Sequence, residues 1–428
     1  MSLLPDELYK LYLQCSAVST DTRKITPGAL FIAIKGPNYD ANEFASDALR
    51  KGARYALVDD AKYADKDGVY LVNNGLDALQ TLARVHRSKL EIPVIGVTGS
   101  NGKTTTKELI HQVLNTSYKT LATRGNLNNH IGVPLTILSI YREIQIAVIE
   151  MGANHLGEIA GLCEIARPTH GLITNIGHAH IEGFGSFEGV IRGKSELYQY
   201  LIENRGVAFI NSEDEILSNM SKRFNQPIFY ASPGDFLHLR LTGNDPFLKF
   251  IGESGREVAT QLIGSYNFYN VAAALCIGKF FKVPSELAER AVAEYVPTNN
   301  RSQVVNLGSN IIILDAYNAN PSSMVAALDN LLSMGSTRKM VILGDMMELG
   351  SESEDAHRKI LEKTRNGIDL VLLCGPLMAE ARQANPEALY FEDKSGLIDY
   401  LKDNPPDHST ILIKASRSMG LEEMVEYL

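Results

Sequence analysis

The sequence predicts an α/β protein of three domains. Three observations lead to this prediction. The chain has 428 residues, enough for two to four domains of about 100 to 200 residues each. Short apolar runs that end in glycine or polar residues alternate with segments of helical spacing, as in mostly parallel sheets covered by helices. The pattern is interrupted near residues 90 and 297, where we place the domain boundaries.

Residues 1–90 are predicted to form a small α/β domain. Strands are expected where short apolar runs lie between glycines or polar residues, and a helix where apolar residues recur three and four apart. The strand runs are GALFIAIKG (28–36), YALVDD (55–60) and VYLVNN (69–74), and the helical run is ALQTLARVHRSKL (78–90).

Residues 91–297 are predicted to form a central domain of P-loop type, with a mostly parallel sheet and helices on both faces. Its first strand, IPVIGVTG (92–99), ends in glycine and leads into a helix, TTKELIHQVLNTS (105–117). Later strands are expected in IQIAVIEMG (144–152), HGLITNIGHAH (170–180) and GVAFIN (206–211). Three short hairpin strands are expected between residues 238 and 264, before a helix over 269–281.

Residues 298–428 are predicted to form a Rossmann-like α/β domain. The preceding EYVPTNNRS (294–302) breaks the pattern with Pro297 and two asparagines. Each of the following apolar strands leads into a loop rich in Gly, Asn or Ser. These segments are NIIILDAYNANPSS (310–323), KMVILGDMMELG (339–350), DLVLLCG (369–375) and STILIKASRSMG (409–420).

The composition excludes several classes of function. The formal net charge is −9, which argues against broad attraction to nucleic acid or to anionic membranes. The four cysteines are scattered without a CxxC pair, so we expect free thiols. The N-terminus does not resemble a signal peptide, and no apolar run approaches the roughly 20 residues of a membrane span. We therefore expect a cytoplasmic protein.

The loop after the first central strand predicts a phosphate site. Gly99 and Gly102 allow backbone N–H groups to face an anion at the start of a helix. Lys103 is in position to reach the outer phosphates and Thr104 to bind Mg²⁺. The strict P-loop pattern fails, because Val97 stands where its first glycine belongs. An ordinary glycine-rich turn with a solvated lysine remains the alternative.

Other strand ends carry polar residues that suit the same site, because ligands of open α/β sheets bind at the carboxyl ends of strands. Glu150 follows four apolar residues, as a magnesium-binding carboxylate does. His178 and His180 lie in a glycine-rich loop, and either one taken alone is better explained as a surface or hydrogen-bonding residue than as a ligand. Arg301 follows the linker, where domain closure brings such a residue onto phosphates. The C-terminal strand ends supply Asp315, Tyr317, Asn318, Asn320, Asp345, Glu348, Lys414, Ser416 and Arg417.

Long motifs along nearly the whole chain resemble the Mur ligase family. The ATP loop of that family is similar to residues 99–108, which space their glycines in the family's own way. The other motifs are STDTRKITPGALFIAIKG (19–36), TRGNLNNHIGVPLTIL (123–138), IEMGANHLGEI (149–159), NIGHAHIEGFGSFEGVIRGKSEL (175–197), DAYNANPSSMVAAL (315–328) and LGDMMELG (343–350).

The resemblance implies an ATP-dependent amide ligase of peptidoglycan synthesis and hence of cell wall biogenesis, cell shape and division. GNLNNHIG and YNANPSSM resemble the branch that joins D-alanyl-D-alanine to UDP-N-acetylmuramoyl-tripeptide through an acyl phosphate, giving the pentapeptide, ADP and phosphate. Residues 1–90 would bind the UDP-sugar and 91–297 ATP, while 298–428 would close on ATP and bind the dipeptide. We expect a monomer. The motifs do not distinguish diaminopimelate from lysine at the third position of the tripeptide.

The resemblance also implies roles for individual residues. Lys103, His180, Lys194 and Arg301 would be catalytic. Magnesium, in two ions, would be held by Thr104, Glu150, His180 and a carbamylated Lys194, a residue that sequence physics alone would treat as a solvated charge. ATP would contact Thr98, Gly99, Ser100, Asn101, Gly102, Lys103, Thr104, Thr105, Asn267, Asn270, Arg301 and Asp315. The substrates would contact Ser19, Thr22, Arg23, Asn126, Asn128, Asn129, Asn318, Asn320, Ser416 and Arg417.

The chain departs from the family pattern at Tyr266, where histidine is common, at Ala41 and Asn42, in place of Gly-His, and at Ala415, in place of glycine. Three alternatives remain at this point: a sister ligase, either the tripeptide-forming enzyme or one similar to folylpolyglutamate synthase; a nucleotide-dependent binding module that does not ligate; and an inactive relative. The presence of Lys103, Thr104, Glu150, His180 and Lys194 argues against the last.

Overall fold

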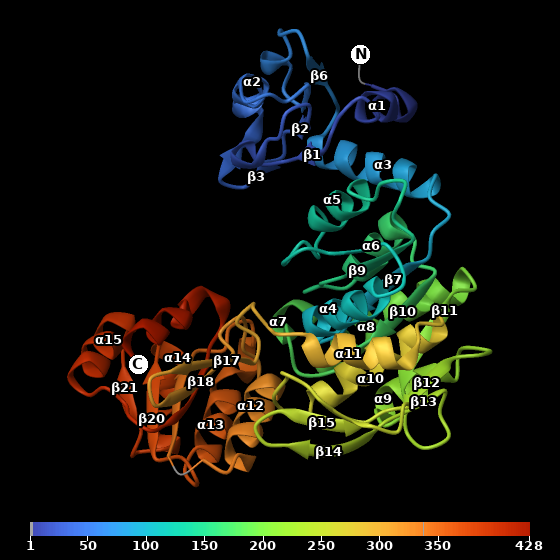
Figure 1. Ribbon diagram of the computed structural model, residues 1–428. Coiled ribbons are helices and arrows are strands. Elements are labelled where there is room, and N and C mark those ends of the chain that lie inside the picture. The colour runs from blue at the N-terminus through green and yellow to red at the C-terminus, as the bar shows by residue number, and fades with distance from the viewer. Residues whose placement is uncertain (1–2, 337) are drawn as a thin grey trace.

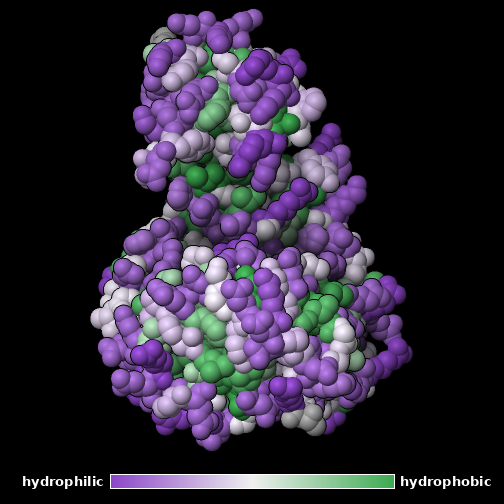
Figure 2. All heavy atoms as spheres, turned by 90° about the vertical axis from the view of Figure 1, so that its left-hand side faces the viewer, coloured by the Kyte–Doolittle hydropathy of each residue, from purple (hydrophilic) through white to green (hydrophobic). Residues whose placement is uncertain are grey.

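The computed structural model describes residues 3–336 and 338–428, which fold into three α/β units in chain order (Figure 1). The predicted three-domain α/β class is confirmed. Figure 2 shows the N-terminal unit as a narrower lobe on a broader body, with hydrophilic side chains over most of that face. No helix in the described part of the chain has the length and apolar character needed to cross a membrane.

The N-terminal unit is built on a four-stranded parallel sheet of order β1-β2-β5-β6. All of β2 is buried, with Leu30 and Ile32 in one apolar cluster and Phe31 in another, as alternation along a strand requires. The elements are α1 (Pro5–Tyr12), β1 (Val18–Ser19), β2 (Leu30–Ile32), β3 (Lys35–Gly36), β4 (Tyr39–Asp40), α2 (Ala45–Arg50), β5 (Tyr55–Val58), β6 (Val69–Leu71) and α3 (Gly75–Ser88).

The central unit is a seven-stranded, fully parallel sheet of order β13-β12-β11-β10-β7-β9-β8. Its first part comprises β7 (Val94–Thr98), α4 (Lys103–Asn115), β8 (Thr120–Ala122), α5 (Gly132–Leu138), β9 (Ile146–Glu150), α6 (Glu158–Ala166) and β10 (His170–Ile173). It continues with α7 (Ile181–Phe184), α8 (Phe187–Glu203), β11 (Val207–Asn211), α9 (Glu215–Ser221), β12 (Ile228–Ala231), β13 (Leu237–His238), α10 (Asn267–Phe280) and α11 (Ser285–Glu294).

Helices cover both faces of this sheet. Ile95 and Val97 of β7 share an apolar cluster with α4 and α10, whereas Val94 shares another with α3, α5, α6 and α8. Helix α3 therefore packs against the central unit as well as against its own sheet, and it lies between the two in Figure 1. The predicted hairpin strands form a separate antiparallel sheet of β14 (Arg240–Asn244), β15 (Leu248–Ile251) and β16 (Glu257–Ala259).

The C-terminal unit is a six-stranded sheet of order β17-β18-β22-β19-β20-β21, parallel except at β17. Its elements are β17 (Gln303–Leu307), β18 (Asn310–Leu314), α12 (Pro321–Ser333), β19 (Lys339–Gly344), α13 (Ser353–Lys363), β20 (Leu370–Cys374), α14 (Pro376–Ala381), β21 (Leu389–Phe391), α15 (Lys394–Asp403) and β22 (Thr410–Lys414).

Strand order in the central sheet positions the site. Strand β7 lies between β9 and β10, so the chain leaves it toward one side and later returns on the other. A crevice forms at the carboxyl ends of strands where the order reverses in this way. The loop after β7 lies at this point, with Glu150 at the end of β9 and Asn175 just beyond β10 on either side.

Candidate active site

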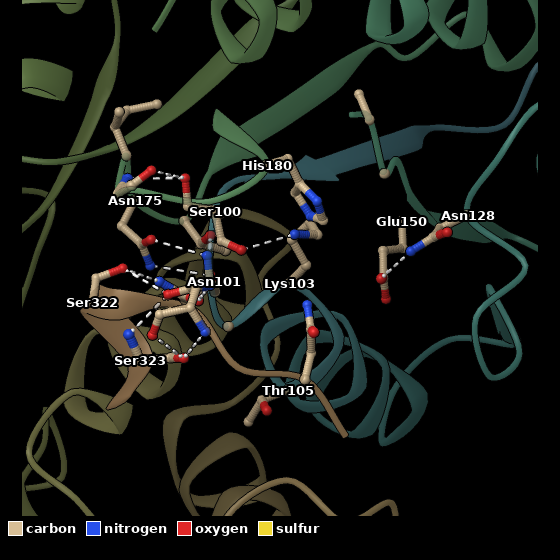
Figure 3. A pocket seen from close by; sticks show the side chains of 18 of the residues that line it. Ser100, Asn101, Lys103, Thr105, Asn128, Glu150, Asn175, His180, Ser322 and Ser323 are labelled. Carbon is tan, nitrogen blue, oxygen red and sulfur yellow. Dashed lines mark hydrogen bonds between the residues drawn. The ribbon is translucent and has the colours of Figure 1, made fainter. Parts of the chain in front are cut away.

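A cavity of about 970 Å³ lies where the three units meet. The ATP loop, which we define as residues 98–105, forms one part of its wall (Figure 3). Gln80 and Arg84 of α3 form another part. Predicted site residues that line the cavity are Ser100, Asn101, Gly102, Lys103, Thr105, Asn128, Asn129, Glu150, His180, Asn267, Asn270, Arg301, Asp315, Asn318 and Asn320. Residues far apart in the chain therefore share one space large enough for a substrate.

The two glycines of the ATP loop are required by its geometry. Gly99 has φ of +144°, and a Cβ there would lie 2.0 Å from Thr174 Oγ1. Gly102 has φ of +76°, and a Cβ there would lie 2.7 Å from Asn270 Oδ1. The loop thus needs glycine at these positions, not at Val97, which explains why the usual P-loop spacing fails.

Lys103 folds back onto its own loop. Its Nζ donates to the carbonyl oxygens of Gly99 at 2.6 Å and Ser100 at 3.0 Å. Burial lowers the pKa of Lys103 to about 8, against the opposing effect of the Glu150 carboxylate. Beneath it, Thr98 Oγ1 donates to the Met151 carbonyl at 2.8 Å and is fully buried, so this side chain supports the loop.

Glu150 is the best-placed metal ligand of the site. The residue is 1% exposed, and Oε1 accepts bonds from Thr104 Oγ1 at 3.2 Å and Asn128 Nδ2 at 2.8 Å. Oε2 is buried without a hydrogen-bond partner. A buried anionic oxygen of this kind suits a hard cation such as Mg²⁺. Among the described residues, no three His, Cys, Asp or Glu side chains converge as a metal cluster.

His180 lines the cavity, whereas Lys194 is buried outside its lining. His180 Nδ1 pairs with Glu348 Oε2 of the C-terminal unit, and His178 lies 3.6 Å from Glu352. Lys194 is fully buried on α8 and does not line the cavity; its Nζ donates to the Ala153 carbonyl at 3.0 Å. Burial lowers the pKa of Lys194 well below its usual value, which favours the neutral amine.

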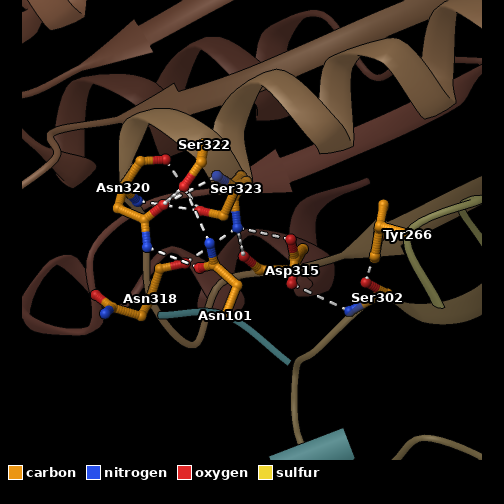
Figure 4. A network of polar contacts seen from close by, with 9 residues as sticks. Asn101, Tyr266, Ser302, Asp315, Asn318, Asn320, Ser322 and Ser323 are labelled. Atoms are coloured by element: carbon orange, nitrogen blue, oxygen red, sulfur yellow. Dashed lines mark hydrogen bonds and ion pairs between the residues drawn. The ribbon is translucent and has the colours of Figure 1, made fainter. Parts of the chain in front are cut away.

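The C-terminal unit contacts the ATP loop directly. Asn101 Nδ2 donates to Ser322 Oγ at 3.0 Å, and Asn320 Nδ2 donates to Asn101 Oδ1 at 2.8 Å (Figure 4). Because the amide of Asn320 also caps α12, the contact is held at a helix start.

A second contact runs through Tyr266, one of the departures from the family pattern. Its hydroxyl lies 2.7 Å from Ser302 Oγ, and the Ser302 N–H donates to Asp315 Oδ1 at 3.1 Å (Figure 4). Asp315 in turn pairs with Lys414 at 2.6 Å. Tyr266 thus connects the central unit to the strand ends of the C-terminal sheet.

Arg301 lines the cavity beside this network. Its guanidinium lies 3.7 Å from the ring centroid of Tyr317, and its Nε is buried without a partner. The Arg417 guanidinium lies 5.4 Å from the same ring and pairs with Glu422. Stacking on Tyr317 therefore holds Arg301 in the site, and its Nε donor remains available to a ligand.

Other predicted residues lie away from the cavity. Ser19, Thr22 and Arg23 are in the N-terminal unit, where Arg23 pairs with Asp21, and Asn126 is in an exposed loop. Ser416 and Arg417 do not line the cavity either; Ser416 Oγ accepts from the Met347 N–H at 2.9 Å.

Asn42, one of the departures from the family pattern in the N-terminal unit, has a structural role. It is fully buried, and its amide donates at 2.7 Å to both Asp40 Oδ1 and Asp59 Oδ1. Its side chain therefore connects Asp40 to Asp59 within the N-terminal unit.

Sequence reasoning missed several residues of the wall. Asn175 accepts from the Asn101 N–H at 3.1 Å and donates to the Asn101 carbonyl at 3.0 Å, so it holds the ATP loop. Its position directly after β10 was the available signal. Gln80 and Arg84 gave no signal, because the sequence does not reveal which face of α3 borders the central unit.

The fold and the cavity define a protein of three α/β domains with a glycine-containing loop at the carboxyl edge of its central sheet. Three family descriptions match in order: "Mur ligase family, catalytic domain" over residues 14–88, "Mur ligase middle domain" over 97–278 and "Mur ligase, glutamate ligase domain" over 300–417. The chain belongs to the Mur ligase family and is an ATP-dependent enzyme.

Two curated relatives match over almost their whole length. UDP-N-acetylmuramoyl-tripeptide–D-alanyl-D-alanine ligase of Escherichia coli is 37% identical, covering 100% of this chain and 96% of that protein. The enzyme of the same name from Bacillus subtilis is 36% identical, covering 96% and 92%.

Two solved structures share the fold throughout. MurF ligase from Thermotoga maritima in complex with ADP superposes with a TM-score of 0.85 at 28% identity, covering 97% of each chain. UDP-N-acetylmuramoylalanyl-D-glutamyl-2,6-diaminopimelate–D-alanyl-D-alanyl ligase from Acinetobacter baumannii gives 0.83 at 28% identity, covering 100% of this chain and 98% of that one.

Proposed function

We propose that the protein joins D-alanyl-D-alanine to UDP-N-acetylmuramoyl-tripeptide at the expense of ATP, giving the pentapeptide, ADP and phosphate in peptidoglycan synthesis. The observation that carries this proposal is the shared cavity, in which the ATP loop faces polar strand ends of the C-terminal unit. The two relatives with this name, matched over nearly their whole length, support the choice of substrates.

The reaction needs ATP because a carboxylate is a poor acyl donor. Transfer of the γ-phosphoryl group to the terminal carboxylate of the tripeptide makes an acyl phosphate with a good leaving group. The amine of the dipeptide attacks its carbonyl carbon, and the tetrahedral intermediate expels phosphate. Two anions must meet in the first step, so cationic groups are needed around them.

The ATP loop supplies the nucleotide site in this proposal. Its backbone N–H groups bind phosphate oxygens at the start of α4, and Lys103 turns from its own carbonyls to the outer phosphates. Arg301 adds a second cation from the C-terminal unit. Asn267, Asn270 and Asp315 are proposed to contact the adenine or ribose, and the first two are held by a mutual bond of 2.8 Å beneath the loop.

Magnesium fits the residues present. The unpartnered Oε2 of Glu150 and the adjacent Thr104 hydroxyl are hard oxygen donors. His180 is a further proposed ligand, and a carbamylated Lys194 is proposed to help hold a second ion; carbamylation needs a neutral amine, which burial favours. Such ions, when bound, neutralise the phosphates and the developing negative charge.

The three units divide the remaining work in this proposal. Residues 1–90 bind the UDP-sugar through Ser19, Thr22 and Arg23, residues 91–297 bind ATP, and residues 298–428 close on ATP and bind the dipeptide. Proposed substrate contacts also include Asn126, Asn128, Asn129, Asn318, Asn320, Ser416 and Arg417. We further propose that the protein acts as a monomer in the cytoplasm.

Phosphate release with UDP-tripeptide and ATP, measured with and without D-alanyl-D-alanine, tests the proposal. Release is expected to require the dipeptide, and mass spectrometry should find the pentapeptide product. Lys103→Ala should abolish ligation, whereas Lys249→Ala, on the exposed face of β15, should not.

Other outcomes of the assay would assign another activity. Product formed instead from a UDP-dipeptide plus a diamino acid, or from a folate plus glutamate, would assign a sister activity. Phosphate release without any ligated product would assign the binding module.

A further inference from the structure

We infer that Arg84 binds a carboxylate of the tripeptide stem that does not react, and so determines affinity for the peptide substrate. This inference rests on the proposed function and extends it to a residue of the N-terminal unit. It starts from the position of Arg84, which lies on α3 yet lines the cavity that contains Lys103 and Glu150.

Arg84 lacks an ionic partner among the described residues. No carboxylate pairs with it, and its one side-chain bond is a long contact of 3.4 Å from an Nη atom to Gln80 Oε1. Arg87, one turn further along the same helix, contrasts with it: that guanidinium is buried and donates to three backbone carbonyls. Arg87 is therefore structural, whereas Arg84 retains donors that face the cavity.

The surroundings hold Arg84 in place. Gln80 donates through Nε2 to the His130 carbonyl at 3.1 Å, so its amide oxygen is fixed toward Arg84. The same loop supplies Asn128, which donates to Glu150. The Arg84 subsite, defined as Gln80, Arg84 and His130, is therefore connected to the Glu150 end of the cavity by a single short loop.

One acid of this cavity, Glu158, is already engaged. Glu158 lines the cavity but accepts from the backbone N–H groups of Asn154 at 2.7 Å and His155 at 3.2 Å. Leu162 and Ile165 of α6 add apolar wall to the same cavity. A ligand with methylene groups ending in a carboxylate fits such a combination, because a guanidinium binds a carboxylate through two parallel bonds.

The stem of the tripeptide has this chemistry. The substrate named for the Acinetobacter baumannii ligase contains D-glutamyl and 2,6-diaminopimelate residues. The glutamyl residue has two carboxyl groups and uses one in the amide to diaminopimelate, so it retains a free carboxylate. Diaminopimelate carries a second carboxylate beyond the one that reacts. The diaminopimelate carboxylate lies beyond a short methylene chain, and the glutamyl residue carries methylene groups beside its own, so either residue presents an apolar segment together with the carboxylate that Arg84 recognises.

Steady-state kinetics of Arg84→Ala and Arg84→Lys test the inference, with ligation measured on UDP-tripeptides that end in diaminopimelate or in lysine. Loss of a charged hydrogen-bond pair should raise the KM for UDP-tripeptide about 10- to 100-fold in Arg84→Ala. The kcat and the KM values for ATP and for the dipeptide should stay within about twofold, because the bond is made equally before and during the reaction. Arg84→Lys should recover part of the loss. Arg290→Ala, exposed on α11, is the matched control and should behave as the unmodified protein.

The two substrates identify which carboxylate is bound. A rise in KM with both substrates assigns the glutamyl carboxylate, and a rise with the diaminopimelate substrate alone assigns the third residue. Unchanged KM values with both substrates would overturn the inference while leaving the proposed function intact. Failure of the unmodified protein to ligate either substrate would overturn both. A fall in kcat at constant KM would also contradict the inference, since it would place Arg84 in the chemical step.

Discussion

Asn320 of the C-terminal unit donates its amide to Asn101 of the ATP loop at 2.8 Å, although 219 positions separate them in the chain. Asn101 completes the contact by donating to Ser322 at 3.0 Å. The nucleotide loop and the start of α12 are thus joined by amide and hydroxyl side chains that carry no charge. A contact of this kind is strong enough to align two units and weak enough to separate.

Asn101→Ala should weaken this alignment without unfolding either unit. Two neutral hydrogen bonds of about 0.5–1.5 kcal/mol each are removed, while the backbone bonds to Asn175 remain. We expect kcat/KM for ATP to fall about 5- to 10-fold at an unchanged melting temperature. Kinetics and differential scanning calorimetry check this, with the exposed Asn219→Ala as control. Kinetics equal to those of the unmodified protein would show that the contact has no part in ATP use.

Arg301→Ala should lower turnover far more than stability. The side chain stacks on Tyr317 at 3.7 Å, and its Nε has no partner. Its removal should therefore change the free energy of unfolding only slightly. If the guanidinium meets the transferring phosphoryl group, kcat should fall about 100-fold. Arg240→Ala, exposed on β14, should leave kcat unchanged. A normal kcat for Arg301→Ala would remove Arg301 from the proposed catalytic residues.

Lys194→Ala and Lys194→Met should both be nearly inactive, because neither side chain can form a carbamate. Lys194 is fully buried, so the alanine variant leaves room for a small molecule, whereas methionine fills much of the space. Acetate or another short carboxylate should therefore restore part of the activity of Lys194→Ala only. Circular dichroism shows whether both variants fold. Full activity of the methionine variant, with or without acetate, would exclude the carbamate role.

His170 should make stability depend on pH. Burial lowers the pKa of His170 to about 4, whereas an unfolded histidine titrates near about 6.5. Between these values the unfolded state binds more protons, so the free energy of unfolding should decrease as the pH falls from about 6.5 to about 4. His170→Gln should reduce that decrease in thermal melts, and the exposed His238→Gln should not. An identical pH dependence in His170→Gln would contradict the prediction.

The parts of the fold and site that could be predicted were those encoded in short stretches. The strand before the ATP loop, its glycines and the helix after it are adjacent in sequence, and the structure has each in place. Glu150 was recognisable because an acid ends an apolar strand. The proposed chemical roles of these residues stay predictions.

Residues whose importance depends on tertiary packing were not predictable. Arg84 and Arg87 lie one turn apart on α3, yet only the fold turns the first toward a cavity and the second onto backbone carbonyls. In the sequence Lys194 has no feature that separates it from other helical lysines. Its amine is buried only because of the way α8 packs in the fold. The pairing of His180 with Glu348 joins two units. A local sequence pattern does not predict a contact between residues so far apart in the chain.

The bonds from Lys103 to the carbonyls of Gly99 and Ser100 have a consequence for nucleotide affinity. A phosphate that approaches this loop competes with two internal acceptors for one ammonium group. The binding free energy at this residue is therefore an exchange, in which carbonyl contacts are given up as phosphate contacts form. The measured affinity for nucleotide will report the difference in free energy between the phosphate contacts and the carbonyl contacts of Lys103. It will therefore be smaller than the free energy of the phosphate contacts alone.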